Sequence, residues 1–172
     1  MDKARLAGLF YLLTFITGGL ALVTSGSVGL VVGLCAGGCY LVVTVLLYQL
    51  FKPVDRTVSL IAAVASVIGI AAGPLPWKPV NPLVFFGVYC LLLGYLIIKS
   101  RLLPSVVGGL LAFAGLGWLT FLSPWLTQML YPYNIAPGII GEGALTVWLL
   151  VRGVASRQVR QHAPRITHTS KL

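Results

Sequence analysis

The sequence has few charged residues, and acids are the scarcest of them. Only 9% of its 172 residues are charged, with three Asp and Glu against twelve Lys and Arg. Globular domains carry about 25% charged residues, and they need polar side chains to cover their surfaces. Hydrophobic residues make up 58% of this chain, and its mean hydropathy is +0.98. The composition therefore disfavours a soluble domain and predicts a membrane protein.

Residues that build catalytic and cofactor sites are also scarce. Both histidines, His162 and His168, lie beyond the last apolar run, which excludes a haem held by paired histidines inside a bundle. The three cysteines lie in apolar runs without the further ligands of a metal site, so we interpret them as packing residues. The apolar runs contain no phosphate loop, no nucleophile beside a base and no carboxylate pair. We therefore expect no enzymatic activity, no metal and no cofactor.

Long apolar runs are abundant, and each is close to the roughly 17 to 25 residues that a helix needs to cross a bilayer. Helices are expected because lipid cannot satisfy unpaired backbone amides, and because barrel strands would be shorter and alternating. The predicted fold is an all-α membrane protein, a six-transmembrane-helix bundle forming one domain over residues 1–153, with a basic tail at 154–172. The predicted spans are about 6–23, 28–51, 58–76, 83–98, 105–123 and 136–152.

The positive charges divide unequally between the two sets of connecting segments. Eleven of the twelve Lys and Arg residues precede the first run, follow the last, or lie in the second and fourth connections, whereas the other set holds only Lys78. Because cytoplasmic segments are enriched in Lys and Arg, this asymmetry predicts that both termini are cytoplasmic. We predict a multi-pass protein of a plasma membrane.

The ends of the chain leave two alternatives to weigh. The first run could be a secretory signal, but it is longer than the roughly 7 to 15 apolar residues typical of one, so we keep it as a span. The basic tail is expected to lie on anionic lipid, where each cation near the surface contributes about 1 kcal/mol. Nucleic acid is not expected as a partner, because the charges form short clusters between apolar runs rather than one continuous stripe.

Two connections on the side opposite the cytoplasm, residues 73–82 and 123–137, are rich in proline and aromatic residues. We call them the outer connections. They contain Trp77, Trp125, Tyr131 and Tyr133, which we interpret as an interfacial aromatic belt. A sharper alternative is that the two connections form one stiff lip over the bundle. Small residues at helical spacing predict where helices approach closely, or where another membrane protein or a second copy packs. These packing candidates are Gly29, Gly33, Gly37, Ser66, Gly69, Gly73, Gly108, Ala112 and Gly115.

Glu142 is the only acid inside an apolar run. Counted from a helix start at Ala136, it lies about 9 Å below the outer interface. A charged residue at mid-membrane costs about 2.5 to 3.5 kcal/mol on insertion scales, so Glu142 should be protonated, hydrogen-bonded or paired. Its helix face also holds Gly138, Thr146 and Leu149, which predicts that it points into the bundle.

The candidate binding residues surround this carboxyl group. Lys78 is the only cation predicted on the same side, and tyrosine or asparagine partners, such as Asn81, are equally open. Glu142 could lock the last helix in place or could serve ligand binding or proton handling. The leading function is a non-enzymatic accessory or interaction subunit, and the alternative is a carrier or binder of an apolar or cationic molecule. The full candidate set is Glu142, Lys78, Asn81, Trp77, Trp125 and Asn134.

Four stretches together resemble a known family. Residues 4–16, 46–56, 93–104 and 141–153 are similar, in order and spacing, to the bacterial integral membrane family catalogued as domain of unknown function 4386. The resemblance implies a multi-helix bacterial membrane protein and gives weight to Glu142. It implies no activity, because the family has none established.

Overall fold

The computed structural model describes residues 2–75 and 80–154, and within these ranges helices are the only regular elements. This confirms the all-α prediction. Two short 3₁₀ turns, Thr120–Leu122 and Tyr133–Ile135, flank one of the seven helices. The α-helices are α1 (Lys3–Val23), α2 (Gly26–Phe51), α3 (Arg56–Ala72), α4 (Leu83–Ser100), α5 (Ser105–Leu119), α6 (Pro124–Leu130) and α7 (Ala136–Val151).

Five of the helical segments are long and apolar enough to cross a membrane, namely α1, α2, α4, α5 with its 3₁₀ extension, and α7 with the turn before it. Many large apolar side chains point outward from them, such as Leu22, Val106 and Ile139. The architecture is therefore that of a multi-helix membrane protein. At 17 residues, α3 is shorter. The count of six spans stays a prediction.

The third helix ends earlier than the predicted span. It stops at Ala72, although Gly73 keeps a helical backbone conformation, because Pro74 has no N–H with which to continue the hydrogen bonds of the helix. The end predicted near residue 76 lies outside the described residues. The fifth helix, α5, ends at Leu119, before the expected end at 123. A 3₁₀ turn follows it directly.

The second outer connection contains a helix where only a stiff loop was expected. In α6, the Ser123 side chain caps the helix by accepting a hydrogen bond from the Leu126 amide, and Pro124 occupies the first turn. Both residues favour a helix start, since Ser is a preferred cap and Pro is preorganised for the first position. Trp125, Tyr131 and Tyr133 nearby are largely exposed.

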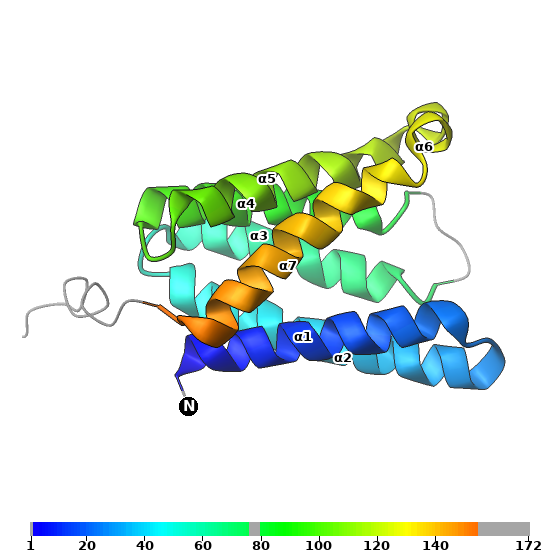
Figure 1. Ribbon diagram of the computed structural model, residues 1–172, viewed down its shortest axis with the longest axis horizontal. Helices are drawn as coiled ribbons and strands as arrows, with labels where there is room; N and C mark the ends of the chain where they lie inside the picture. Colours follow the sequence, from blue (N-terminus) through cyan, green and yellow to red (C-terminus); the bar gives the residue numbers. More distant parts are fainter. Residues whose placement is uncertain (1, 76–79, 155–172) are drawn as a thin grey trace, which may run out of the picture.

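The six longer helices form a closed ring around a common interior (Figure 1). Each packs against two others, in the order α1, α2, α3, α4, α5, α7 and back to α1. Helices that are consecutive among these six are neighbours. The last of them, α7, lies diagonally between α5 and α1 and closes the ring (Figure 1). This diagonal path brings the end of α7 beside the start of α1.

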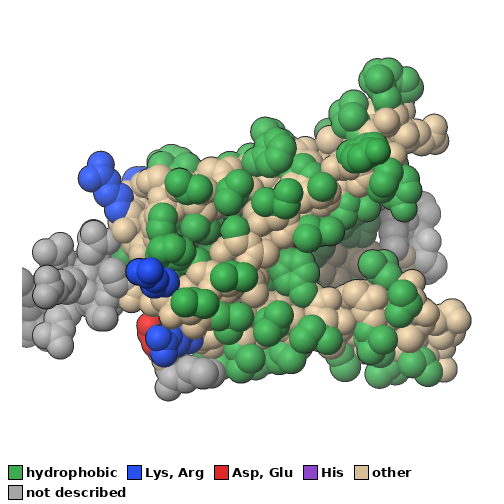
Figure 2. Space-filling view, in the orientation of Figure 1, with side chains coloured by type: hydrophobic (Ala, Val, Ile, Leu, Met, Phe, Trp, Pro, Cys, Tyr) green, Lys and Arg blue, Asp and Glu red, His purple; other side chains and the backbone are tan. Residues whose placement is uncertain are grey.

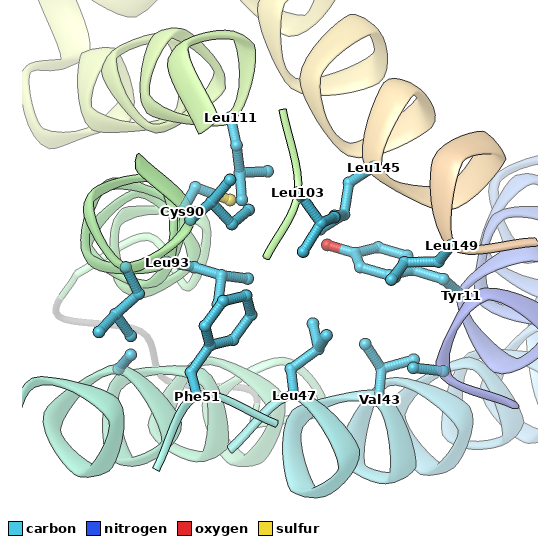
Figure 3. Packing of buried hydrophobic residues seen from close by; sticks show 14 of the residues in the cluster. Tyr11, Val43, Leu47, Phe51, Cys90, Leu93, Leu103, Leu111, Leu145 and Leu149 are labelled. Atoms are coloured by element: carbon cyan, nitrogen blue, oxygen red, sulfur yellow. The ribbon is translucent and has the colours of Figure 1, made fainter. Parts of the chain in front are cut away.

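The two ends of the ring differ. We call the end that holds Lys3, Lys52, Lys99 and Arg152 the basic end, and the opposite one the open end. Large apolar side chains fill the interior toward the basic end, including Phe51, Leu93 and Leu149 (Figure 3). Lys and Arg gather there on the face shown in Figure 2. The core therefore closes the bundle at its basic end.

Glycines bring α4 and α5 into close contact. A Cβ at Gly94 would lie 2.7 Å from the Gly108 carbonyl oxygen, and one at Gly115 would lie 2.7 Å from the Gly87 carbonyl oxygen. Only glycine permits this separation of the two backbones, as in other small-residue contacts between membrane helices.

A single ion pair occurs among the described residues, and it lies at the basic end. The Lys99 ammonium donates to the Asp55 carboxylate at 2.8 Å, and the Val58 amide donates to the same carboxylate. The hydrogen bond from Lys99 is the larger cause, and the two together lower the pKa of Asp55. This pair ties the start of α3 to the end of α4.

Replacing Gly115 by Val should destabilise the bundle, because the new side chain would meet the Gly87 carbonyl and Leu91. Overpacking of this kind costs about 1 to 3 kcal/mol. The matched control is Gly109→Val on the same helix, where an added Cβ meets nothing within 4 Å. Equilibrium unfolding by sodium dodecyl sulfate in mixed micelles measures the difference, and equal stability of the two variants would contradict the contact.

The charge distribution predicts that the basic end faces the cytoplasm. In a bacterial expression host, a green fluorescent protein fused after Leu172 should fluoresce. Alkaline phosphatase, which folds only outside the cytoplasm, should be active when fused after Leu130. The reverse pattern would overturn the predicted orientation.

Candidate binding site

Glu142 lies inside the ring, with 7% of its surface exposed. The other residues of its helix face, Gly138, Thr146 and Leu149, are also buried. Its carboxyl group accepts hydrogen bonds from Trp118 Nε1 at 2.8 Å and from the Tyr11 hydroxyl at 3.0 Å. The Cys90 thiol is a weaker donor at 3.8 Å. These three donors come from α5, α1 and α4, so Glu142 of α7 links four helices through neutral groups.

Glycines on α7 make room for this arrangement. Gly138 faces the Trp118 indole so closely that any side chain there would overlap the ring, and Gly141 faces the backbone of Leu110. The two glycines therefore let α7 approach α5, which places the indole N–H against the carboxyl group one turn further along. Gly143 has no such role, because an added Cβ there would meet nothing within 4 Å.

Tyr40 of α2 extends the cluster across the ring. Its hydroxyl lies 3.3 Å from that of Tyr11, close enough for a hydrogen bond. Edge-on aromatic contacts join the Tyr40 ring to Tyr11, Phe86 and Tyr89, with ring centroids 5.5, 5.0 and 6.0 Å apart. Figure 3 shows Tyr11 directed into the interior from α1. Polar and aromatic groups thus form a layer above the apolar core.

A cavity of about 780 Å³ begins at this layer and extends to the open end. Its walls come from the second half of α1, the first half of α2, the end of α3 and the start of α4. Glu142 and Trp118 are the contributions of α7 and α5. Figure 2 shows the molecule hollowed between α1 and the start of α7. Ligand pockets commonly measure about 300 to 1,000 Å³, so this one has the size of a small-molecule site.

The cavity lies where α7 and α1 diverge from each other toward the open end. At Gly8 an added Cβ would lie 2.8 Å from the Leu150 amide nitrogen, so the two helices touch there. Toward the open end α7 follows α5 instead (Figure 1). Gly18 and Gly19 on α1 and Gly38 on α2 line the resulting space, and an added Cβ at any of them would meet nothing within 4 Å.

The predicted site residues are not all brought together. Asn81 lines the cavity wall, but its side chain accepts a hydrogen bond from the Leu83 amide rather than bonding to Glu142. Asn134 is buried and donates to Thr120 Oγ1 at 3.1 Å, and Trp125 is exposed on α6. Trp77 and Lys78 lie outside the described residues, which leaves the pairing of Lys78 with Glu142 a prediction.

The two outer connections do adjoin each other where they are described. Val80 and Asn81 share a small depression with Phe121, Pro124 and Thr127. For these residues, the arrangement is the one expected if the two connections form a lip.

The predicted packing residues have different surroundings. Gly69 lies against Phe86, Ser66 is hydrogen-bonded to Thr44 at 2.7 Å, and Ala112 lies against Gly94. Gly108 and Gly115 form the α4–α5 contact described above. Gly29, Gly33, Gly37 and Gly73 line the cavity instead.

Sequence reasoning did not identify the groups that bind Glu142. Tyr11, Trp118 and Cys90 each lie within a predicted span, among apolar residues. A signal was available, because a buried Tyr or Trp usually finds a partner for its O–H or N–H. What the sequence does not show is which helices are neighbours, and these donors come from three different helices.

The geometry is suited to binding rather than to metal chemistry. Among residues 2–75 and 80–154, no three His, Cys, Asp or Glu side chains are placed to share a metal ion. The carboxyl group lies at the closed end of a mainly apolar cavity, with its other contacts made by neutral donors. Such a site offers shape, aromatic surface and one anionic or acidic group to a ligand.

A known protein similar to this chain carries no activity in its description. An archaeal protein of Archaeoglobus fulgidus, described as uncharacterised, is 27% identical over 123 residues, which cover 64% of this chain and 75% of that protein. No solved structure matches the chain. The relative is archaeal, so the bacterial origin inferred from the sequence stays a prediction.

The family model named "Domain of unknown function (DUF4386)" matches residues 80–153, a range that contains Trp118, Glu142 and the α4–α5 contact. The family resemblance seen in the sequence is thus confirmed over residues 80–153.

Proposed function

We propose that this protein is a non-enzymatic membrane protein that binds a small, largely apolar molecule in the cavity between α1, α2, α3 and α4. The observation that carries the proposal is the cavity of about 780 Å³ with the buried Glu142 carboxyl at its closed end. An apolar wall supplies most of the binding energy in such sites, and a few polar groups fix the orientation of the ligand.

The cavity lining supports this function over a purely structural role for the space. Large side chains fill the interior near the basic end, whereas three of the glycines that line the cavity, Gly18, Gly19 and Gly38, have no atom within 4 Å of an added Cβ. Glycine within a helix costs about 1 kcal/mol relative to alanine. Glycines that make no close contact therefore gain nothing in packing, but they do keep the cavity wide.

Glu142 has both a structural and a binding aspect in this proposal. Its bonds to Trp118 and Tyr11 hold α7 to α5 and α1, and part of the carboxyl group also faces the cavity. The two aspects separate in variants, because glutamine keeps an oxygen for the indole N–H while its amide can donate to the Tyr11 hydroxyl. Tyr11 can then donate to Tyr40 instead.

The accessory or interaction function has less support. It was inferred from a surplus of small-residue packing faces, and the most closely packed of them, at Gly94, Gly108 and Gly115, are used between α4 and α5 of the same chain. Isolation in mild detergent with a stoichiometric membrane-protein partner would favour that function over the binding function proposed here.

Filling the cavity should weaken binding. Replacing Gly18 by Leu adds a side chain where no atom lies within 4 Å, and should lower the affinity for neopentylbenzene, a small apolar probe, by about tenfold, or about 1.4 kcal/mol. Equilibrium dialysis against proteoliposomes, with protein-free liposomes subtracted, measures this affinity. The control is Gly109→Leu, which fills equally open space outside the cavity. Equal affinity of the two variants would refute the site.

Substitutions of Glu142 should separate its structural and binding aspects by stability. Glu142→Leu leaves the Trp118 N–H and the Tyr11 O–H without their acceptor, and an unsatisfied buried donor costs about 1 to 3 kcal/mol. Glu142→Gln should remain within about 0.5 kcal/mol of the parent, as expected when no partner is lost. Unfolding in mixed micelles compares the variants. A glutamine variant as unstable as the leucine variant would show that the carboxyl group itself is needed for folding.

A further inference from the structure

We infer that the ligand of this cavity is a lipophilic organic cation, a molecule with a bulky apolar body around a tertiary or quaternary ammonium or similar group. This inference rests on the proposed binding function and specifies its ligand class. Glu142 is the only Asp or Glu among the described residues that line the cavity, and no Lys or Arg is among them.

The carboxyl group has hydrogen bonds but no counter-ion among the described residues. Its donors, Trp118, Tyr11 and Cys90, are all neutral, and the one ion pair of the described chain joins Asp55 to Lys99 at the basic end. A buried carboxylate without a paired charge is unfavourable in a medium of low dielectric constant. A cationic ligand would supply the missing charge.

The remaining lone pairs permit such a contact. Oε1 accepts from Trp118 and, weakly, from Cys90, whereas Oε2 accepts from Tyr11. A carboxylate oxygen has two lone pairs, so Oε2 can face a further donor or a positive charge. A neutral apolar ligand would leave this capacity unused.

Aromatic rings surround the same end of the cavity. Tyr11, Phe15, Tyr40, Phe86 and Trp118 all line it. Tyr11 stacks on Phe15 with ring centroids 6.0 Å apart, and Tyr40 meets Phe86 edge-on at 5.0 Å. Aromatic faces attract cations through their negative potential, and cages of such rings recognise quaternary ammonium groups. Aromatic surface and a carboxyl group together favour an organic cation over an inorganic one, which would need oxygen ligands.

The apolar part of the ligand follows from the shape of the cavity. On α1 the lining runs from Tyr11 to Leu22, which is about 16 Å along the helix axis. Beyond the aromatic layer the walls are aliphatic side chains, glycines and prolines, such as Leu30, Leu34 and Pro74. The ligand is therefore a cation with extensive hydrocarbon surface, and a small hydrophilic amine would leave most of this space unfilled.

The test compares a cation with its neutral isostere. Benzyltrimethylammonium and neopentylbenzene have the same shape and differ in one atom, nitrogen against carbon. Binding is measured by equilibrium dialysis against proteoliposomes of zwitterionic lipid, with protein-free liposomes subtracted. We expect the cation to bind the parent protein at least about tenfold more tightly than it binds the Glu142→Gln variant, as for a charge-assisted contact. The affinity for neopentylbenzene should not change between these two proteins.

Two further variants complete the test. Asp55→Asn removes an acid at the basic end, far from the cavity lining, and should leave binding of the cation unchanged. Phe15→Leu removes an aromatic face and should weaken the cation by about threefold while sparing the isostere. It keeps the inference testable if Glu142→Gln fails to fold.

The outcomes distinguish the two levels of the proposal. If Gly18→Leu weakens both probes while Glu142→Gln changes neither, the cavity binds ligands but the cationic class is wrong. If the neutral isostere binds the parent protein as tightly as the cation does, the inference is likewise overturned. If neither probe binds above protein-free liposomes, the proposed function fails with it.

Discussion

The structure depends on one carboxyl group that receives its hydrogen bonds from other helices. Glu142 of α7 accepts from Trp118 of α5 and Tyr11 of α1, and the Cys90 thiol of α4 lies nearby. Without a hydrophobic driving force between helices in lipid, polar contacts and close packing decide which helices associate. The bonds from Glu142 join α1 to helices late in the sequence, and so close the ring. The same bonds place the carboxyl group where core and cavity meet.

The contrast between core and cavity follows from how large and small residues are distributed along the helices. Toward the basic end, α2 contributes Val43, Leu47 and Phe51 to the interior, whereas its first half contributes mainly glycines and lines the cavity. In α4 and α5, by contrast, glycines bring the two backbones together. The same residue type therefore produces contact at some positions and space at others. What differs is whether a partner backbone lies opposite.

That difference explains how much could be predicted from the sequence. Apolar runs and their boundaries predicted the helices to within a few residues, because span length and proline positions are local properties. The inward direction of Glu142 was predicted because its neighbours at helical spacing are small or polar. The donors Tyr11 and Trp118 were not, since they depend on which helices adjoin. Glycine spacing likewise predicted close packing for Gly33 and Gly37, which the structure places on the cavity wall. Local spacing identifies a small-residue face but not what lies opposite it.

The distribution of charge among the described residues supports the cation selectivity proposed for the cavity. The described Lys and Arg side chains lie at the basic end, separated from the Glu142 carboxyl by the apolar core. Among the described residues, the apolar core thus keeps the acid at the cavity floor apart from Lys and Arg. Under the proposed function, the partners of this carboxyl group for a proton or a cation are therefore molecules that enter the cavity.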